Sequence, residues 1–383
     1  MRIEAVFFAL IAVFWVVQGI RACRGMATIP RLSQVPLNGE RCYPRISVLL
    51  GARDEAAKLP AALQSLLSLD YPNYEVIAVD DRSRDETGAI LDRLAATDSR
   101  LTVVHVNELP SEWLGKPHAL QTAYELSTGE WLVFTDADVS FAKDLLTRAY
   151  TLTDANNWDH LTLLTALELH GFWETATIAY LGLGFAIGLE PWRVSDPKSD
   201  KFFGVGAFQL VRRSAYEKIG MHETLAMEVV DDIKLGKLIK MDGFRSGVAI
   251  SEEYVKLRWQ DGFLNLIHGL TKNLFAGFGF KVRDVVLPLV AVFILSIFPW
   301  LALFFAKGPA LAACLAAVIA PAVVQGLLVR ETYKPAWYGL AHPLGAMIFI
   351  YMVLRSMCIT LWRGGIVWRG TFYPLAELRK GQV

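Results

Sequence analysis

The chain has 383 residues, which is long for one ordinary domain and predicts two or more compact units. Lysine plus arginine and aspartate plus glutamate balance at 38 each, so no net charge favours a nucleic-acid partner, and none is expected. The hydrophobic fraction of 54% is above the usual range for soluble domains, and the four cysteines show neither metal-ligand spacing nor a disulfide framework.

The first apolar run predicts a membrane anchor over residues 1–22. Residues 5–20 are almost entirely apolar, and Arg21, Arg24 and Arg31 follow them. No convincing signal-peptide cleavage site follows the run, so we interpret it as uncleaved. By the positive-inside rule the arginines place the next segment in the cytoplasm. We therefore expect an integral membrane protein whose next domain lies on the cytoplasmic side, in a bacterial inner membrane.

From Arg45 onward, apolar runs with strand character alternate with helical spacing. Strands are predicted at 46–50, 74–79 and 101–106 and from Trp131, and helices at 55–66, 87–95 and 116–126. This alternation predicts an α/β class with a mostly parallel, doubly wound sheet over residues 45–280. The sequence contains neither a G-x-G-x-x-G motif nor a P-loop. A ligand that carries phosphate groups must therefore be bound in another way.

The strand from Trp131 ends in two carboxylates, Asp136 and Asp138, separated by one residue. Ligands of a parallel α/β sheet bind outside the carboxyl ends of its strands. One or two carboxylates commonly hold a hard divalent cation while substrate phosphates complete its shell. An isolated Asp-x-Asp is usually a solvated turn or a helix N-cap, but the acidic sites elsewhere in this sheet favour a site for a hard divalent cation.

Two further acidic pairs and one lysine have positions suited to chemistry. Asp80 and Asp81 follow the second strand, where carboxylates can accept hydrogen bonds from a base or a ribose; the alternative is a helix cap. Lys116 opens the next helix, where it can meet phosphate. Asp231 and Asp232 precede an apolar helical pattern and could include a general base, although a helix N-terminus with acidic residues is the competing interpretation.

The C-terminal part predicts transmembrane helices over 284–361 and a basic, aromatic tail over 362–383. Three crossings from a cytoplasmic domain would place the tail outside, whereas its positive charges favour the inside. Either the segment around Pro343 is re-entrant, or one apolar run does not span. Residues 175–189 form another apolar run, which predicts equally a buried helix or one in the membrane interface.

These motifs occur in an order that resembles a family-2 glycosyltransferase of the GT-A fold. They are the strand and turn at 48–55, Val79-Asp80-Asp81-x-Ser83-x-Asp85-x-Thr87, Gly115-Lys116, Phe134-Thr135-Asp136-Ala137-Asp138, residues 203–208 and 212–220, Asp231-Asp232-x-x-Leu235-Gly236, and Arg258-Trp259. The match runs from about Arg45 to Asn273. The terminal spans resemble lipid-directed members, such as ceramide glucosyltransferases and bacterial hopanoid- or carotenoid-associated glycosyltransferases.

The resemblance implies roles at the donor end of the site. Asp80 or Asp81 would contact the uracil or ribose of a nucleotide sugar, for which a UDP-sugar is expected. Ala52 and Glu55, in the turn after the first strand, would belong to the same site. Lys116 would also bind the donor.

It also implies the residues of the reaction centre. Asp136 and Asp138 would hold Mg²⁺ or Mn²⁺ against the diphosphate, and Asp136 would also contact the nucleotide sugar. Asp232, beside Asp231, would deprotonate the acceptor hydroxyl. The remaining implied residues, near the diphosphate and the acceptor subsite, are Arg258 and Trp259.

Two positions depart from the usual pattern. Asp231 stands where glutamate is usual, which keeps the charge, and Val255 replaces the glutamine of Gln-x-x-Arg-Trp. The second change disfavours a processive polysaccharide synthase. We therefore predict an inverting enzyme that moves one sugar to a membrane lipid acceptor. A polysaccharide synthase and an inactive membrane scaffold with the same fold are the alternatives.

Overall fold

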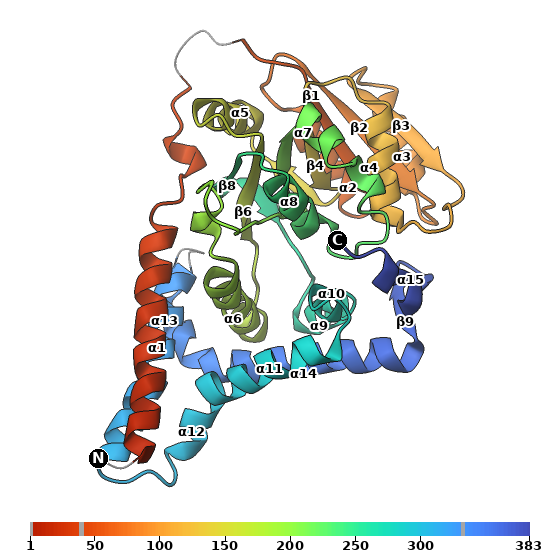
Figure 1. Ribbon diagram of the computed structural model, residues 1–383. Helices are drawn as coiled ribbons and strands as arrows, with labels where there is room; N and C mark the ends of the chain where they lie inside the picture. Colours follow the sequence, from red (N-terminus) through yellow and green to blue (C-terminus); the bar gives the residue numbers. More distant parts are fainter. Residues whose placement is uncertain (1–2, 38–41, 331–333) are drawn as a thin grey trace. The chain divides into compact units, whose positions relative to one another are not determined.

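The computed structural model describes residues 3–37, 42–330 and 334–383, and the chain divides into two compact units (Figure 1). Unit 1 consists of Met1–Thr28, Leu169–Pro191 and Trp259–Ile366. Unit 2 consists of Ile29–Glu168, Trp192–Arg258 and Val367–Val383. Each unit is therefore assembled from separated segments of the chain. Residues 1 and 2 of the predicted anchor lie outside the described residues.

An eight-stranded sheet in the order β3-β2-β1-β4-β7-β6-β8-β5 forms the centre of unit 2. The strands are β1 Ile46–Ala52, β2 Tyr74–Asp81, β3 Leu101–Val106, β4 Trp131–Asp136, β5 Val139–Phe141, β6 His160–Leu167, β7 Gln209–Arg212 and β8 Ser246–Leu257. β1 pairs in parallel with β2 and β4, β2 with β3, and β6 with β8, whereas β7 and β5 run antiparallel to their neighbours. The predicted mostly parallel α/β sheet is confirmed.

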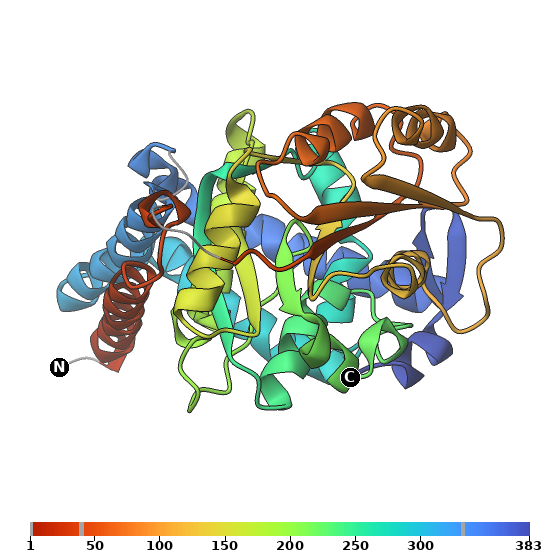
Figure 2. The ribbon, with the colours of Figure 1, turned by 90° about the horizontal axis from the view of Figure 1, so that it is seen from above.

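The helices of unit 2 lie on both faces of this sheet. They are α2 Leu59–Leu67, α3 Thr87–Ala95, α4 Gly115–Glu125, α5 Leu145–Ala155, α7 Arg213–Lys218, α8 Asp231–Met241 and α15 Leu375–Lys380. Figure 2 shows α2 and the pair α7 and α8 on opposite sides of the strands.

One predicted helix begins later than expected. The apolar spacing predicted a helix from residue 55, but α2 begins at Leu59, and its first turn contains Pro60. Proline suits a first turn because its missing N–H would have no helical partner there. Glu55 consequently lies in the turn between β1 and α2, where its N–H donates to Thr87 Oγ1 at 2.9 Å. Glu55 therefore lies in the loop after the carboxyl end of β1 and not within a helix.

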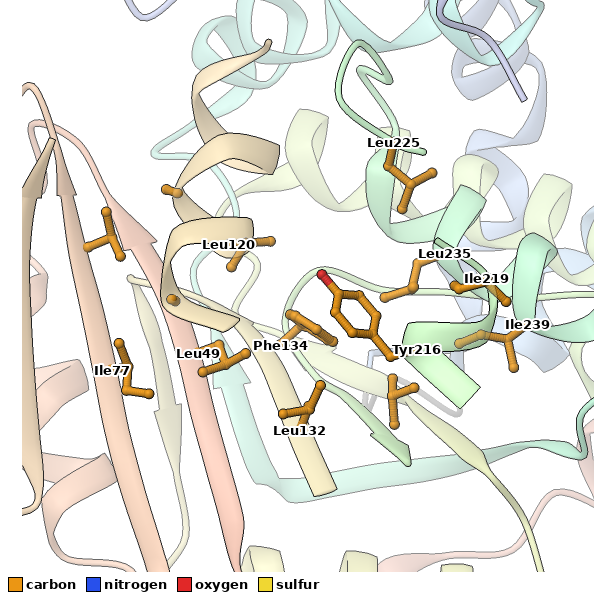
Figure 3. Packing of buried hydrophobic residues seen from close by; sticks show 14 residues of the cluster. Leu49, Ile77, Leu120, Leu132, Phe134, Tyr216, Ile219, Leu225, Leu235 and Ile239 are labelled. Atoms are coloured by element: carbon orange, nitrogen blue, oxygen red, sulfur yellow. The ribbon is translucent and has the colours of Figure 1, made fainter. Parts of the chain in front are cut away.

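One apolar cluster fixes the two helices that carry predicted site residues. Leu120 of α4 and Leu235 of α8 pack with Phe134 of β4 and Tyr216 of α7, as Figure 3 shows. Burying a side chain of this size contributes about 1.5–3 kcal/mol. The Tyr216 hydroxyl is also satisfied, because it lies 2.6 Å from His222 Nδ1. The first turns of α4 and α8 are therefore held firmly against the sheet.

Unit 1 is built from apolar helices. They are α1 Ile3–Met26, α6 Phe172–Leu189, α9 Phe263–Leu270, α10 Asn273–Gly277, α11 Val282–Val292, α12 Phe298–Ala302, α13 Pro309–Val329 and α14 His342–Arg363. Five segments in the described part of the chain are long and apolar enough to cross a membrane: Ile3–Met26, Phe172–Arg193, Val282–Ala302, Pro309–Val329 and Ala336–Arg363. These helices fit association with a membrane, as the sequence predicted.

Helices α1 and α13 pack side by side (Figure 1). Trp15 of α1 is buried against Cys314 and Ala317 of α13, and its indole N–H donates to the Leu295 carbonyl at 2.9 Å. Gly19 permits close approach, since a Cβ there would collide with Val324. A small residue at the crossing point is typical of helix pairs in membranes.

The connectivity limits how these helices can cross a bilayer. The chain leaves unit 2 after Glu168 and returns to it at Trp192, and β6 and β7 on either side of α6 pair in one sheet. A single complete crossing by α6 would separate paired strands across the membrane. We infer that α6 is not a lone crossing, which agrees with both interpretations of residues 175–189.

The same argument applies to the tail. Residues Val367–Val383 belong to unit 2 together with the sheet. We infer that the chain between Trp259 and Ile366 returns to the side of the membrane that carries the sheet. The number of complete crossings stays a prediction.

Candidate active site

The predicted acidic residues meet at one edge of the sheet. In the registers of β1 with its two neighbours, Ala52 lies opposite Asp80 of β2, and Gly51 lies opposite Asp136 of β4. The carboxyl ends of the three parallel strands therefore bring these side chains to the same edge. Asp232, in the first turn of α8, lines a pocket together with Lys116 and Asp231.

Lys116 is the cation at the centre of this pocket. Its Nζ lies 2.7 Å from Asp136 Oδ1 and 3.8 Å from Asp231 Oδ2. Burial alone would lower the pKa of Lys116, but the charges of Asp136, Asp231 and Asp232 outweigh it and raise the pKa. The ammonium group stays protonated, and its helix places it where a phosphate would find both a cation and backbone N–H groups.

Asp232 has a fixed orientation. The Gly206 N–H donates to its Oδ2 at 2.9 Å, and the Ile233 N–H donates to its Oδ1 at 2.8 Å. Gln209 donates to its main-chain carbonyl at 3.2 Å. Asp232 therefore presents a carboxylate of fixed position to the pocket, and a general base must be placed within hydrogen-bond reach of the proton it takes.

Close contacts explain why residues 204 and 206 are glycines. A Cβ at Gly204 would collide with the Asp232 carbonyl oxygen. A Cβ at Gly206 would lie 2.8 Å from Asp136 Oδ2 and 3.3 Å from Asp232 Oδ2. Gly206 thus occupies the narrow space between the predicted diphosphate end and the predicted base. A larger residue would fill the place where reacting groups must meet.

Asp138 is the more buried carboxylate of the Asp-x-Asp pair. Lys58 Nζ lies 3.4 Å from its Oδ2 and donates to the Arg258 carbonyl at 3.2 Å. Burial, together with the charges of Asp136 and Glu55, raises the pKa of Asp138 to about 6. The negative charges around Asp138 would therefore favour a cation beside it.

The donor atoms of Asp136 and Asp138 fit a hard divalent ion, for which oxygen ligands are preferred. Among residues 3–37, 42–330 and 334–383, no group of three or more histidine, cysteine, aspartate or glutamate side chains forms a metal site by itself. A site of two carboxylates would therefore be completed by oxygen atoms of a substrate.

Asp80 and Asp81 have different surroundings. Asp80 accepts the Ser83 N–H at 3.2 Å and lies 3.0 Å from His105 Nδ1. Asp81 accepts two hydrogen bonds from the Arg82 guanidinium, at 2.7 and 3.1 Å. Asp81 also lies against the first residue of α4, because a Cβ at Gly115 would collide with its Oδ2. Asp81 is therefore the one of the pair that directly adjoins the Gly115-Lys116 motif.

The other predicted residues are distributed as follows. Ala52 is buried at the end of β1, and Glu55 pairs with Arg369. Arg258 Nη1 donates to the Glu168 carbonyl at 2.6 Å. Trp259 is the first residue of a unit 1 segment, and its role stays a prediction.

Two participants were missed in the sequence. Lys58, the partner of Asp138, lies outside every recognised motif. Tyr373, whose hydroxyl accepts the Gly115 N–H at 3.3 Å, lies in the predicted membrane-interface tail. No periodicity or motif marks either residue, so only the folded chain could reveal them.

The chain is similar in sequence to known glycosyltransferases. The family model described as Glycosyl transferase family 2 matches residues 47–220. A 4,4'-diaponeurosporenoate glycosyltransferase of Staphylococcus aureus is 24% identical over 357 residues, covering 88% of this chain and 90% of that protein. A beta-monoglucosyldiacylglycerol synthase of Synechocystis is 28% identical over 247 residues, covering 62% of this chain and 50% of that protein.

A protein of similar fold has a solved structure. The mannosyltransferase PcManGT from Pyrobaculum calidifontis, solved with GDP-Man and Mn²⁺, superposes with a TM-score of 0.54 at 20% sequence identity. The superposition covers 93% of this chain and 99% of that chain. At this level of identity the similarity concerns the fold.

Proposed function

This chain is a glycosyltransferase with a family-2 domain of the GT-A fold, and from that premise we propose that it moves a single sugar from a nucleotide-sugar donor to a membrane lipid, with inversion. The observation that carries this proposal is that Lys116, which pairs with Asp136, and the oriented Asp232 carboxylate line one pocket. Gly206 leaves open the space between them. A donor leaving group and an acceptor hydroxyl can therefore be brought to the same point.

Asp232 is the proposed general base. Its carboxylate takes the proton of the acceptor hydroxyl while that oxygen bonds to the anomeric carbon. The bond from the anomeric carbon to the diphosphate oxygen breaks in the same displacement, and the electron pair leaves with the diphosphate. Attack opposite the leaving group inverts the configuration, so no second carboxylate nucleophile is needed. The N–H donors of Gly206 and Ile233 hold the carboxylate of the base in position.

The diphosphate end is assigned to Lys116, Asp136 and Asp138. The Lys116 ammonium group is placed to offset negative charge on the departing diphosphate. Asp136 and Asp138 would hold Mg²⁺ or Mn²⁺, which when bound supplies Lewis-acid stabilisation of the leaving group. Lys58 offsets the charge of Asp138 and holds it in place through its 3.4 Å contact.

The acceptor and the location follow from the apolar helices and the relatives. The two relatives are named for action on diaponeurosporenoate and for making monoglucosyldiacylglycerol, and five apolar segments give this chain access to a bilayer. Arg21 and Arg24 at the end of α1 support a cytoplasmic position for unit 2. We expect a UDP-sugar donor, and GDP is the alternative because PcManGT was solved with GDP-Man.

A processive synthase remains the second candidate, and one observation disfavours it. Val255, at the position where the processive pattern has glutamine, is fully buried in β8 and pairs with Phe141 of β5. An apolar, buried side chain offers no hydrogen bond to a growing glycan. Product length in a transfer assay separates the two, since a single-transfer enzyme gives one added sugar per lipid.

The first experiment measures thermal unfolding of the full chain in detergent with UDP or GDP, each with and without Mn²⁺. Stabilisation by one nucleotide that requires Mn²⁺ is expected for the wild type and should be lost in Asp138→Ala. Asp242→Ala, an exposed acidic residue at the other end of α8, is the matched control and should behave as wild type. The absence of stabilisation by either nucleotide at millimolar concentration would support the inactive scaffold instead.

A further inference from the structure

The last segment of the chain forms a β-hairpin that reaches the predicted donor residues of unit 2. Its strands are β9 Gly365–Trp368 and β10 Thr371–Pro374. The two residues between them, Arg369 and Gly370, have φ angles of 48° and 77°. Two successive left-handed residues form a tight hairpin turn, for which asparagine and glycine are preferred. Arginine at such a position carries a backbone cost, which persists where other contacts offset it.

The hairpin makes its polar contacts with the loops assigned to the nucleotide. The Arg369 guanidinium donates to the Glu55 carboxylate, and Arg53 donates to Thr371 at 3.5 Å. The Tyr373 hydroxyl accepts the Gly115 N–H and also interacts with Arg82, the partner of Asp81. Each loop that supplies a predicted nucleoside contact is therefore touched by one residue of the hairpin.

The place where these loops meet holds polar atoms with unmet hydrogen-bonding capacity. Arg53 Nε and His118 Nδ1 are buried, and neither has a hydrogen-bond partner in the part of the chain that the structure describes. The Arg53 side chain is only 10% exposed and lies 3.7 Å from Asp81. Buried polar groups without partners are rare and call for an explanation. A polar ligand that reorders these side chains on binding would supply one.

The hairpin belongs to unit 2 from Val367 onward, and this part of the chain is anchored at its far end. Leu378 of α15 is fully buried, and the Val383 N–H donates to Glu228 at 2.7 Å. Lys234 of α8 donates to the Val383 carbonyl and lies 3.2 Å from Glu228. The segment thus extends from the donor loops to the helix that carries the proposed base.

We propose that the hairpin β9–β10 is a wall of the nucleoside end of the donor site, with Tyr373 and Arg369 as positioning residues for the Asp81 and Glu55 loops. The inference rests on the proposed function, and it lies outside the residues 47–220 that the family model matches. Tyr373 acts through Gly115 and Arg82, and Arg369 acts through Glu55. The ligand recognised is the nucleoside part of a nucleoside diphosphate.

The test compares two ligands in the full chain in detergent with Mn²⁺: the nucleoside diphosphate that stabilises the wild type, and inorganic pyrophosphate. Tyr373→Phe removes one hydroxyl, and Arg369→Asn removes the ion pair while keeping a residue suited to the left-handed turn. We expect each variant to raise the Kd for the nucleoside diphosphate about tenfold, the usual weight of one hydrogen bond to a charged group. The Kd for pyrophosphate should not change.

Controls separate positioning from general loss of structure. Phe372→Ala changes a half-exposed neighbour in the same hairpin and should stay within about twofold of wild type, as surface substitutions usually do. Arg369→Lys should restore part of the lost affinity. Equal losses for both ligands, or a lowered melting temperature with unchanged nucleotide affinity, would overturn the proposal. A wild type that binds no nucleoside diphosphate would instead overturn the proposed function.

Discussion

The pocket of unit 2 and the core of unit 1 around α13 treat buried polar groups in different ways. In unit 2 the pocket brings together charged groups, with Lys116 between Asp136 and Asp231 and with Asp232 held by N–H donors. In the core of unit 1 around α13 the partners are neutral, as where His342 Nδ1 lies 2.8 Å from Gln325 Oε1. Paired charges keep their electrostatic influence on a bound substrate. Neutral pairs only avoid the cost of an unmet hydrogen bond.

The largest expected effect comes from removing the charge of the proposed base. Asp232→Asn should lower kcat by about 10²–10⁴-fold, the usual contribution of general acid–base catalysis. Affinity for the nucleoside diphosphate should stay near the wild-type value, because Asn keeps the side chain's size. Transfer rates and nucleotide Kd measured on the same preparation test this. A loss smaller than tenfold would show that another group takes the proton.

A smaller effect, on the stability of unit 2, is expected from removing the charge of Glu75 near the amino-terminal end of β2. Burial alone would raise the pKa of Glu75, but hydrogen bonds from Arg45, Ser47 and Thr128 lower it to about 2 from its ordinary 4.5. A lowered folded-state pKa gives stability that is present above the unfolded pKa and is lost as pH falls through the folded value. Hydrogen bonds to a charged group contribute about 1.5–3 kcal/mol.

Glu75→Gln should therefore destabilise unit 2 at pH 7 and much less as the pH falls from 4.5 toward 2. Thermal unfolding of wild type and variant at pH 7 and near pH 3 measures the difference. Other carboxylates titrate equally in both proteins, so their contribution cancels. A difference that does not shrink on acidification would contradict the assigned pKa shift.

The smallest effect, again on stability, is expected from removing a neutral hydrogen-bond partner in unit 1. Gln325→Leu leaves His342 without its partner and should cost about 1–3 kcal/mol, whereas replacing both residues by leucine should recover most of the loss. Unfolding in detergent measures both. Nucleoside diphosphate affinity should not change, because every residue proposed to bind the donor, other than Trp259, belongs to unit 2. A changed affinity would show that the two units are coupled more closely than the comparison implies.

The sequence by itself determined the central features of unit 2. Alternating apolar and helical patterns predicted the parallel strands β1 to β4, and the position of the acidic pairs at the carboxyl ends of β2 and β4 predicted that they lie at the functional edge. Such patterns are readable because strand and helix periods are local. The order of the motifs likewise implied a family-2 glycosyltransferase domain, and the model of that family matches residues 47–220. The five apolar segments were identified by the same kind of local information.

Only the tertiary structure decided which distant residues complete the site. Arg369 meets Glu55 across 314 positions of the chain, Lys58 meets Asp138 across 80, and the return of α6 to the sheet excludes a lone crossing. A contact between two single side chains leaves no repeating pattern in the sequence. Its geometry depends on where packing brings two loops together, and that is fixed by the whole core and not by the residues in contact.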